Sequence, residues 1–202
     1  MPAVKSNVGC NPVDRFYLCH IYRRCSPFLL KKSPVDIVST RYSPFFFYFS
    51  FSFHKAAFKT IVNTVLESKQ PQIRQKNLHI ANTVEDDRVV TGDGILLFQA
   101  ISNLIQNAID FSPEGGCIAL DTGIDGAMLR FTVTDEGTSI PDYAREKIFD
   151  KFFSLQRPGN GKKSTGLGLN LVKEVAQLHN GKITLTNRTR QGVRATLSLP
   201  LS

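Results

Sequence analysis

One helix-length stretch in the middle of the 202-residue chain constrains the fold more than any other part of the sequence. Residues 95–111 carry apolar side chains at helical spacing, with Leu97, Ile101 and Leu104 on one side, which predicts a helix packed on a core. The opposite side carries amides and one carboxylate, namely Gln99, Asn103, Gln106, Asn107 and Asp110. Such a stripe is often plain solvated surface. Because Asn lowers helix propensity and solvated faces favour Lys, Glu or Arg, we instead expect this face to bind a ligand.

Shorter regular stretches surround this helix. We expect two more helices over residues 57–68 and 166–179, and strands over residues 78–81, 117–122, 129–134, 183–187 and 193–199. Pro71 is expected to end the first helix, and Asn180 with Gly181 offers a left-handed stop for the last. Because hairpin-linked strands are mixed with helices, the pattern predicts an α+β fold, a two-layer α/β sandwich with helices packed on one face of a mixed β-sheet.

The first 55 residues differ in character from the rest. They hold twelve of the chain's twenty aromatic residues and eight Lys/Arg against two Asp, whereas residues 56–202 carry seventeen basic and fifteen acidic residues. The net charge of +8 therefore belongs to the N-terminal segment, and it does not predict nucleic-acid binding by the main domain. The aromatic run at 45–53 is shorter than the roughly 20 apolar residues that cross a bilayer, and no signal-peptide pattern precedes it. We expect a poorly ordered or membrane-adherent segment over residues 1–55 and one domain over residues 56–202.

The cysteine spacing predicts free thiols. Cys10, Cys19 and Cys25 stand close to the start and Cys117 stands alone much later. None of them forms the Cys-x-x-Cys pair of a zinc site, and three early cysteines cannot all pair among themselves. Free thiols are typical of a reducing cytosol.

Two features suit a nucleotide and its metal. An Asn carboxamide such as that of Asn107 offers Mg²⁺ an oxygen ligand without adding negative charge beside a triphosphate. Asp135 follows a strand, where its carboxylate can accept a hydrogen bond from an exocyclic amine, and Gly137 lets a base approach the backbone closely. Taken alone, the second feature is also an ordinary acidic turn.

A glycine pair at the start of the last helix forms a third feature. Gly166 and Gly168 leave backbone N–H groups exposed, and the helix dipole favours phosphate there. The pattern matches neither the dinucleotide-binding fingerprint nor a P-loop. Lys162 and Lys163 beside it can neutralise phosphate, although lysines in a loop are equally ordinary.

In this order and spacing, the three features resemble the N, G1 and G2 boxes of the GHKL ATPase superfamily, specifically the catalytic domain of sensor histidine kinases. Residues 103–108 are similar to the N box, Asp135 to the aspartate of G1, and residues 166–169 to G2. Residues 148–153 resemble the F box, which separates histidine kinases from chaperone, topoisomerase and mismatch-repair relatives. Residues 192–200 resemble the terminal glycine and strand. The resemblance covers roughly residues 57–200.

The resemblance implies a GHKL (Bergerat) sandwich that binds ATP and Mg²⁺, with Asn107 holding the metal and Asn103 assisting. It assigns no catalytic side chain. It implies ATP-binding roles for Asn103, Asn107, Asp135, Gly137, Ile140, Phe149, Lys162, Lys163, Thr165, Gly166, Leu167, Gly168, Leu169 and Thr196.

Residues 154–164 are similar to the ATP lid of the CreC subfamily of sensor kinases. The resemblance implies that ATP phosphorylates a histidine and that the phosphoryl group then passes to an aspartate of a response regulator. It also implies a cytoplasmic location. Contact with the inner membrane would come only through parent-kinase segments that this chain lacks.

Two departures from the family pattern stand out. Ser139 occupies a position where G1 normally has Gly, so we expect backbone strain of roughly 1 kcal/mol or crowding of the nucleotide if a left-handed conformation is needed there. None of the four histidines, His20, His54, His79 and His179, has the phosphoacceptor context of the family. We expect His179, near the end of the last helix, to be a surface residue or one that interacts with the dipole at the C-terminus of that helix, and His79 to lie in a strand.

Three functions remain open at this level. The first is a catalytic domain that phosphorylates a histidine-bearing dimerisation domain supplied in trans. The second is a truncated or degenerate remnant, or a regulator, that keeps the fold without transferring phosphate. The third is a free-standing serine kinase of the anti-sigma type, which the F box and the CreC-like lid disfavour.

Overall fold

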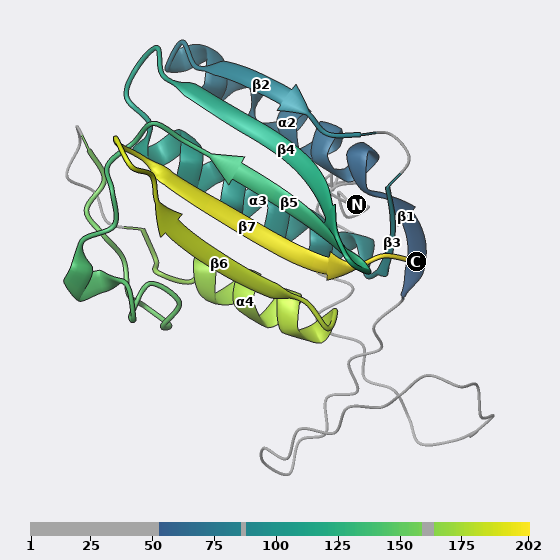
Figure 1. Ribbon diagram of the computed structural model, residues 1–202. Coiled ribbons are helices and arrows are strands. Elements are labelled where there is room, and N and C mark those ends of the chain that lie inside the picture. Colours follow the sequence, from purple (N-terminus) through teal and green to yellow (C-terminus); the bar gives the residue numbers. More distant parts are fainter. Residues whose placement is uncertain (1–52, 86–87, 159–163) are drawn as a thin grey trace, which may run out of the picture. The chain divides into compact units, whose positions relative to one another are not determined.

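Five strands form one mixed sheet in the order β2-β4-β5-β7-β6 (Figure 1). These strands are β2 (His79–Thr83), β4 (Cys117–Asp125), β5 (Met128–Thr134), β6 (Lys182–Asn187) and β7 (Val193–Pro200). Strand β2 pairs in parallel with β4, and the remaining neighbours pair antiparallel. The structure, a computed structural model, describes residues 53–85, 88–158 and 164–202. The expected irregular segment over residues 1–55 lies almost wholly outside them and stays a prediction.

Three helices cover one face of this sheet (Figure 1). They are α2 (Phe58–Gln75), α3 (Gly94–Phe111) and α4 (Gly168–Leu178), and α3 lies between the other two, in contact with both. A single turn of 3-10 helix, η1 (Asp142–Ala144), follows β5. The predicted two-layer α+β sandwich is therefore confirmed, and each of the five predicted strands is found within three residues of its expected ends.

Alternation along the strands builds the core. Every second residue of the central strands faces the helices and is buried, as at Leu120 in β4, Phe131 in β5 and Leu197 in β7. Phe58, the first residue of α2, meets Phe131 edge-on with ring centroids 5.2 Å apart. Since each such side chain stabilises the fold by about 1.5–3 kcal/mol when fully buried, this layer fixes which helix face looks inward.

Helix α2 is longer than predicted, because Pro71 lies inside it rather than at its end. A proline removes one backbone hydrogen bond, but Pro71 is exposed and water can satisfy the carbonyl that is left free. The following turn buries Ile73 to 5% exposure, and this tertiary contact holds the helix to Gln75. A proline does weaken a helix, but the prediction that this helix ends at Pro71 was wrong.

A small second sheet was not predicted. Strand β1 (His54–Ala57) pairs antiparallel with β3 (Val89–Gly92), and Val90 bridges to Leu201 beyond β7. Among the described residues, the first strand thus begins at His54. Both strands are four residues long, which is too short for alternation to be read from the sequence.

His179 contradicts its predicted surface position, because it is buried. Its Nε2 accepts a hydrogen bond from the backbone N–H of Asp93 at 3.0 Å, so Nδ1 carries the proton and donates to the carbonyl of Val175 at 2.7 Å. The ring of Phe53 lies 5.0 Å from the imidazole. His179 therefore ties the end of α4 to the start of α3, and the positions of both helices depend on it.

Both helices have defined ends. The Asp93 carboxylate caps α3 by accepting hydrogen bonds from the backbone N–H groups of Ile95 and Leu96. At the end of α4, Asn180 takes the left-handed conformation (φ 53°), and Gly181 donates to the carbonyl of Ala176 at 2.7 Å, as expected. Within the described ranges, no helix is long and apolar enough to span a membrane.

Candidate functional site

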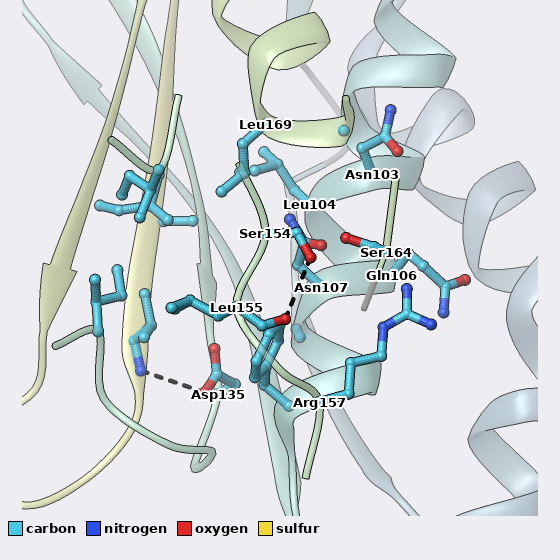
Figure 2. Close-up of a pocket in the computed structure, with 18 of the residues that line it drawn as sticks. Asn103, Leu104, Gln106, Asn107, Asp135, Ser154, Leu155, Arg157, Ser164 and Leu169 are labelled. Atoms are coloured by element: carbon cyan, nitrogen blue, oxygen red, sulfur yellow. Dashed lines mark hydrogen bonds between the residues drawn. The ribbon is translucent and has the colours of Figure 1, made fainter. Parts of the chain in front are cut away.

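A cavity of about 210 Å³ opens between α3, the start of α4 and the ends of β5, β6 and β7 (Figure 2). Its lining comes from segments that are far apart in the sequence. Eight residues predicted to bind ATP are among those that line it: Asn103, Asn107, Asp135, Ile140, Thr165, Gly166, Gly168 and Leu169. The fold thus brings the three sequence features to one place.

The amide face of α3 forms one wall of the cavity. Asn103 donates from Nδ2 to the carbonyl of Gln99 at 3.0 Å, which fixes its carboxamide so that Oδ1 points toward Gly168. The half-buried carboxamide of Asn107 lines the cavity one turn further along, and no hydrogen bond joins it to another described residue. Its oxygen is therefore available to a ligand, which is the property a hard cation needs.

Asp135 forms the opposite end of the site and is buried to 7% exposure. Its Oδ1 accepts hydrogen bonds from the backbone N–H groups of Gly137 at 2.8 Å and Val193 at 3.2 Å. Both hydrogen bonds from described residues thus fall on one oxygen, which leaves Oδ2 for a ligand. Burial raises the pKa of this carboxyl above its ordinary value, and the two hydrogen bonds and the charge of Arg188 only partly offset that effect.

Two glycines let the backbone close around Asp135. A Cβ on Gly137 would lie 2.4 Å from the carbonyl oxygen of Phe111, and a Cβ on Gly192 would lie 2.0 Å from the carbonyl oxygen of Asp135. Gly192 also has a φ of 102°, which L side chains rarely adopt. Gly137 was predicted at the site, and its role is to bring the loop against α3.

Asn187, at the end of β6, fixes the loop that follows Asp135. Its Oδ1 accepts from the backbone N–H of Ile140 and its Nδ2 donates to the carbonyl of the same residue, each at 2.8 Å. Arg188 adds a hydrogen bond to the carbonyl of Asp135 at 3.0 Å. The side chains of Asn187 and Arg188 thus make the hydrogen bonds to the loop backbone that a neighbouring strand would otherwise make, and they hold Ile140 in the cavity wall.

A small apolar cluster closes the cavity below this loop. Ile140, Ala144 and Ile148 are its buried members, and Phe149 and Leu155 pack against them. Phe149 was predicted to touch ATP. The structure instead uses it as support, since it does not line the cavity, and its carbonyl accepts a hydrogen bond from Asn170 at 3.1 Å.

Gly166 joins the F-box segment to the start of α4. Its φ is 68°, a Cβ there would lie 2.4 Å from the backbone of Phe152, and its carbonyl accepts a hydrogen bond from the Phe152 N–H at 3.0 Å. Phe152 itself has a φ of 67° and is 77% exposed. Helix α4 then starts at Gly168, next to Asn103, so that its free N–H groups face the amide wall.

The remaining predicted residues lie elsewhere. Leu167 is 41% exposed and is not part of the lining. Thr196 pairs with Thr132 on the sheet face opposite the helices, where the two hydroxyls lie 3.5 Å apart, so it does not reach the cavity. Lys162 and Lys163 lie outside the described residues.

Ser139 causes none of the expected strain. Non-glycine residues with positive φ in the described part of the chain are Asn77, Phe152 and Asn180, and Ser139 is not among them. It is exposed and does not line the cavity. The loop therefore accepts a serine here, since its side chain points to solvent while Thr138 and Ile140 on either side line the cavity.

Sequence reasoning missed three contributions. The sequence carried no indication of the role of Asn187, because its hydrogen-bond partners are the backbone groups of Ile140, 47 residues earlier in the chain. Arg157 forms an ion pair with Asp110, at 2.6 Å between Nη2 and Oδ2, and this pairing joins residues that no local pattern connects. The apolar floor around Ile148 was visible only as part of the F box.

The fold and the cavity together are those of an ATPase sandwich, with α3 on one side of the cavity and the start of α4 on the other. Residues 92–202, more than half of the chain, match the model of the family described as "Histidine kinase-, DNA gyrase B-, and HSP90-like ATPase", and the chain belongs to this family. The motif-based resemblance to this class is thereby confirmed.

Individual relatives narrow the class to sensor histidine kinases. The sensor protein CreC of Escherichia coli K12 is 46% identical over 137 residues, which cover 67% of this chain and 28% of CreC. The catalytic domain of the histidine kinase ThkA superposes with a TM-score of 0.66 at 28% identity, covering 74% of this chain and 97% of that domain. ThkA in complex with the response regulator protein TrrA matches with a TM-score of 0.63 at 27% identity, covering 75% of this chain and 42% of that one.

The chain spans less than a third of the length of CreC. The matched region corresponds to one catalytic domain, as the near-complete coverage of the ThkA domain indicates.

Proposed function

We propose that residues 56–202 bind Mg-ATP and transfer its γ-phosphoryl group to a histidine on a dimerisation domain in another chain. One observation carries the proposal: an unpartnered amide at Asn107, a buried carboxylate at Asp135 and the N-terminus of α4 face one cavity. A nucleoside triphosphate matches this arrangement, since it presents an exocyclic amine at one end and anionic oxygens at the other.

Adenine is expected at the Asp135 end. The free Oδ2 of Asp135 would accept the hydrogen bond from the exocyclic amine, and Ile140 and Ile148 would contact the ring. The phosphates would then lie against the N–H groups that begin at Gly168, where the dipole of α4 favours negative charge.

Mg²⁺ fits the amide wall. The described residues include no group of three or more His, Cys, Asp or Glu side chains able to hold a metal, so a cation here needs oxygens from the nucleotide as well. Asn107 would supply one carboxamide oxygen and Asn103 would assist, in keeping with the few protein ligands that Mg²⁺ takes beside phosphates. When bound, the ion neutralises charge on the transferred group.

The proposal assigns the acceptor histidine to a dimerisation domain supplied in trans. His54, His79 and His179, the described histidines, do not line the cavity, and both ring nitrogens of His179 are engaged. In the proposed reaction the bond from the γ-phosphorus to the β,γ-bridging oxygen breaks, a bond to an imidazole nitrogen forms, ADP leaves, and the imidazole releases its proton. A response regulator would receive the phosphoryl group next. We further propose a cytoplasmic site of action, where ATP is available, on behalf of a membrane-anchored parent kinase.

Thermal unfolding tests the binding step. At a Mg-ATP concentration near 100 times Kd, binding stabilises the folded state by about 2.7 kcal/mol, which raises Tm by several degrees. Mg-GTP serves as the control, because a guanine presents a carbonyl where adenine presents its amine. An unchanged Tm at saturating Mg-ATP would rule out the proposal.

Radiolabelled ATP tests the transfer step. The protein is incubated with labelled ATP and a separately purified CreC-type dimerisation domain, with a variant of that domain lacking the histidine as control. Label on the histidine-bearing domain alone supports the kinase. Binding without transfer would mean that the chain has kept the nucleotide site and lost the reaction.

A further inference from the structure

Arg157 is the one cation among the described residues that line the cavity. It lies on the segment that crosses the cavity after Phe153, where Leu155 packs into the apolar floor (Figure 2). Its guanidinium reaches α3 and pairs with Asp110, at 2.6 Å between Nη2 and Oδ2. A triphosphate carries more negative charge than one Mg²⁺ cancels, so the position of this cation matters.

Asp110 is the residue of α3 that pairs with Arg157. It lies on α3 three residues after Asn107, and residues at this spacing share a helix face. Its side chain is 13% exposed, and its Oδ1 accepts a hydrogen bond from Gln106 at 3.0 Å. In the nucleotide-free protein Asp110 does not itself line the cavity, and it holds the guanidinium of Arg157 through this ion pair.

We propose that Arg157 exchanges partners on nucleotide binding, leaving the Asp110 carboxylate and taking a phosphate oxygen of ATP. This inference rests on the proposed function and adds to it a phosphate-binding residue together with a residue, Asp110, that positions it beforehand. A guanidinium suits both partners, because carboxylate and phosphate accept the same pair of parallel N–H bonds.

Asp110 does not lose all compensation when Arg157 leaves. Lys69 on α2 lies near enough for Asp110 to raise its pKa, against the larger effect of burial, which lowers that pKa. The charge of Lys69 therefore interacts favourably with Asp110, and the exchange leaves this interaction in place.

Calorimetric titration with Mg-ATP, together with an NMR titration with adenosine, tests the phosphate contact. Arg157→Gln is expected to weaken Mg-ATP binding about tenfold, since a charge-assisted hydrogen bond is lost. Adenosine binding is expected to stay within about twofold, because the base end is untouched. Arg157→Lys keeps the charge and is expected to retain most of the ATP affinity. Arg145→Gln is the matched control, since Arg145 forms an exposed ion pair with Asp142 at 3.0 Å away from the cavity.

A double-mutant cycle tests the exchange itself. Asp110→Asn frees Arg157, so it is expected to strengthen Mg-ATP binding about threefold in the wild-type background and to have less effect beside Arg157→Gln. If Asp110 only repelled phosphate, its removal would help more once Arg157 is gone, and that opposite order would overturn the proposal. Equal loss of ATP and adenosine affinity in Arg157→Gln would also overturn it, while the proposed function would stand. A wild-type protein that binds no Mg-ATP would overturn both.

Discussion

The two ends of the cavity are built differently. Around Asp135, backbone groups and fixed side chains from β6 and β7 hold the loop through hydrogen bonds of 2.8–3.2 Å. Glycines allow contacts there that no Cβ would permit. Across the cavity, the contacts of residues 152–158 include backbone hydrogen bonds from Phe152 to Gly166 and from Phe153 to Asp150, the packing of Phe153 and Leu155, and the Arg157 ion pair.

This difference suits the two ends to different tasks in the proposed site: the Asp135 end to recognising a base, and residues 152–158 to adjusting to different phosphate groups. A base is recognised by hydrogen bonds with fixed directions, so the Asp135 end gains from being preorganised before the ligand arrives. Phosphates differ between ATP and ADP, and a segment with few contacts adapts to either at low cost. We expect substitutions at the first end to change stability and those at the second to change nucleotide binding.

The largest effect is expected from Gly192→Ala. The added Cβ would lie 2.0 Å from the Asp135 carbonyl oxygen, which belongs to the backbone and cannot rotate away. We expect the free energy of unfolding in urea to fall by about 3 kcal/mol or more. Gly126→Ala is the control, because Gly126 also has positive φ (60°) but has open space around it, and it should cost only about 1 kcal/mol. Equal losses would show that conformation, rather than close approach, dominates at Gly192.

Asn107→Ala is expected to remove nearly all of the stabilisation by Mg-ATP, about 2.7 kcal/mol at 100 times Kd, as measured by the shift in Tm. The nucleotide-free protein should melt almost as the wild type does, since no described residue is hydrogen-bonded to the Asn107 side chain. Asn63→Ala, on the exposed face of α2, should leave the shift intact. A full shift in Asn107→Ala would remove this residue from the site.

Asn187→Ala tests whether the Asp135 end is as rigid as its contacts indicate. The variant leaves the N–H and carbonyl of Ile140 without partners, which should cost about 2 kcal/mol of unfolding free energy. Asn187→Asp keeps the acceptor and loses the donor, so an intermediate loss is expected. Hydrogen exchange at the Ile140 amide should rise in Asn187→Ala, and unchanged protection there would contradict the role of this contact.

Asp135→Asn is expected to weaken ATP binding by about tenfold or more while leaving the empty protein at least as stable at pH 7. Backbone N–H groups hold one oxygen, so the new NH₂ group faces the adenine amine, donor against donor. Burial raises the folded-state pKa of Asp135 above the ordinary 3.8. Wild-type stability should therefore decrease as pH rises from that value through the folded pKa, and the variant should not share this decrease.

Urea unfolding at several pH values measures the difference in unfolding free energy between the wild type and Asp135→Asn. The advantage of Asp135→Asn should be absent at the acid end, grow through this window and then level off. Asp125→Asn, at an exposed carboxylate, controls for the loss of one charge. An advantage that shrinks with rising pH would contradict the direction of the pKa shift.

The smallest effect is expected from Ser139→Gly. Restoring the family glycine should change ATP affinity by less than about twofold and lower stability by about 0.5 kcal/mol through greater freedom of the unfolded chain. Calorimetric titration and urea unfolding measure the two quantities. A large gain in affinity would show that the serine crowds the nucleotide after all.

Periodic elements were predictable from the sequence. The apolar stripe of α3 and the alternation of β4, β5 and β7 are local patterns, and their burial follows from them. Pro71 shows the limit of local rules, because the burial of Ile73 outweighs the cost of a proline at an exposed position. The two short strands β1 and β3 acquire their structure from pairing with each other and, for β3, from contacts with the C-terminal residues Leu201 and Ser202.

The candidate site divides in the same way. Asn103, Asn107, Asp135 and the glycines before α4 belong to contiguous motifs, and their side-chain chemistry together with the resemblance to the family's boxes made them candidates. The partners of these residues are distant in sequence, so they carried no local signal. Asn187 and Arg157 act on backbone or side chains that the fold brings near, and His179 is buried because two helix ends meet around it.

The sequence by itself determined the sandwich, its family and the residues proposed to face a nucleotide, because periodic burial and contiguous motifs are local properties of the chain. Only the tertiary structure decided how these residues are held. It gave Asp135 one free oxygen and a raised pKa, left Asn107 without a partner, and set Arg157 against Asp110. These features depend on burial and on contacts between distant segments, and both exist only once the layers have packed.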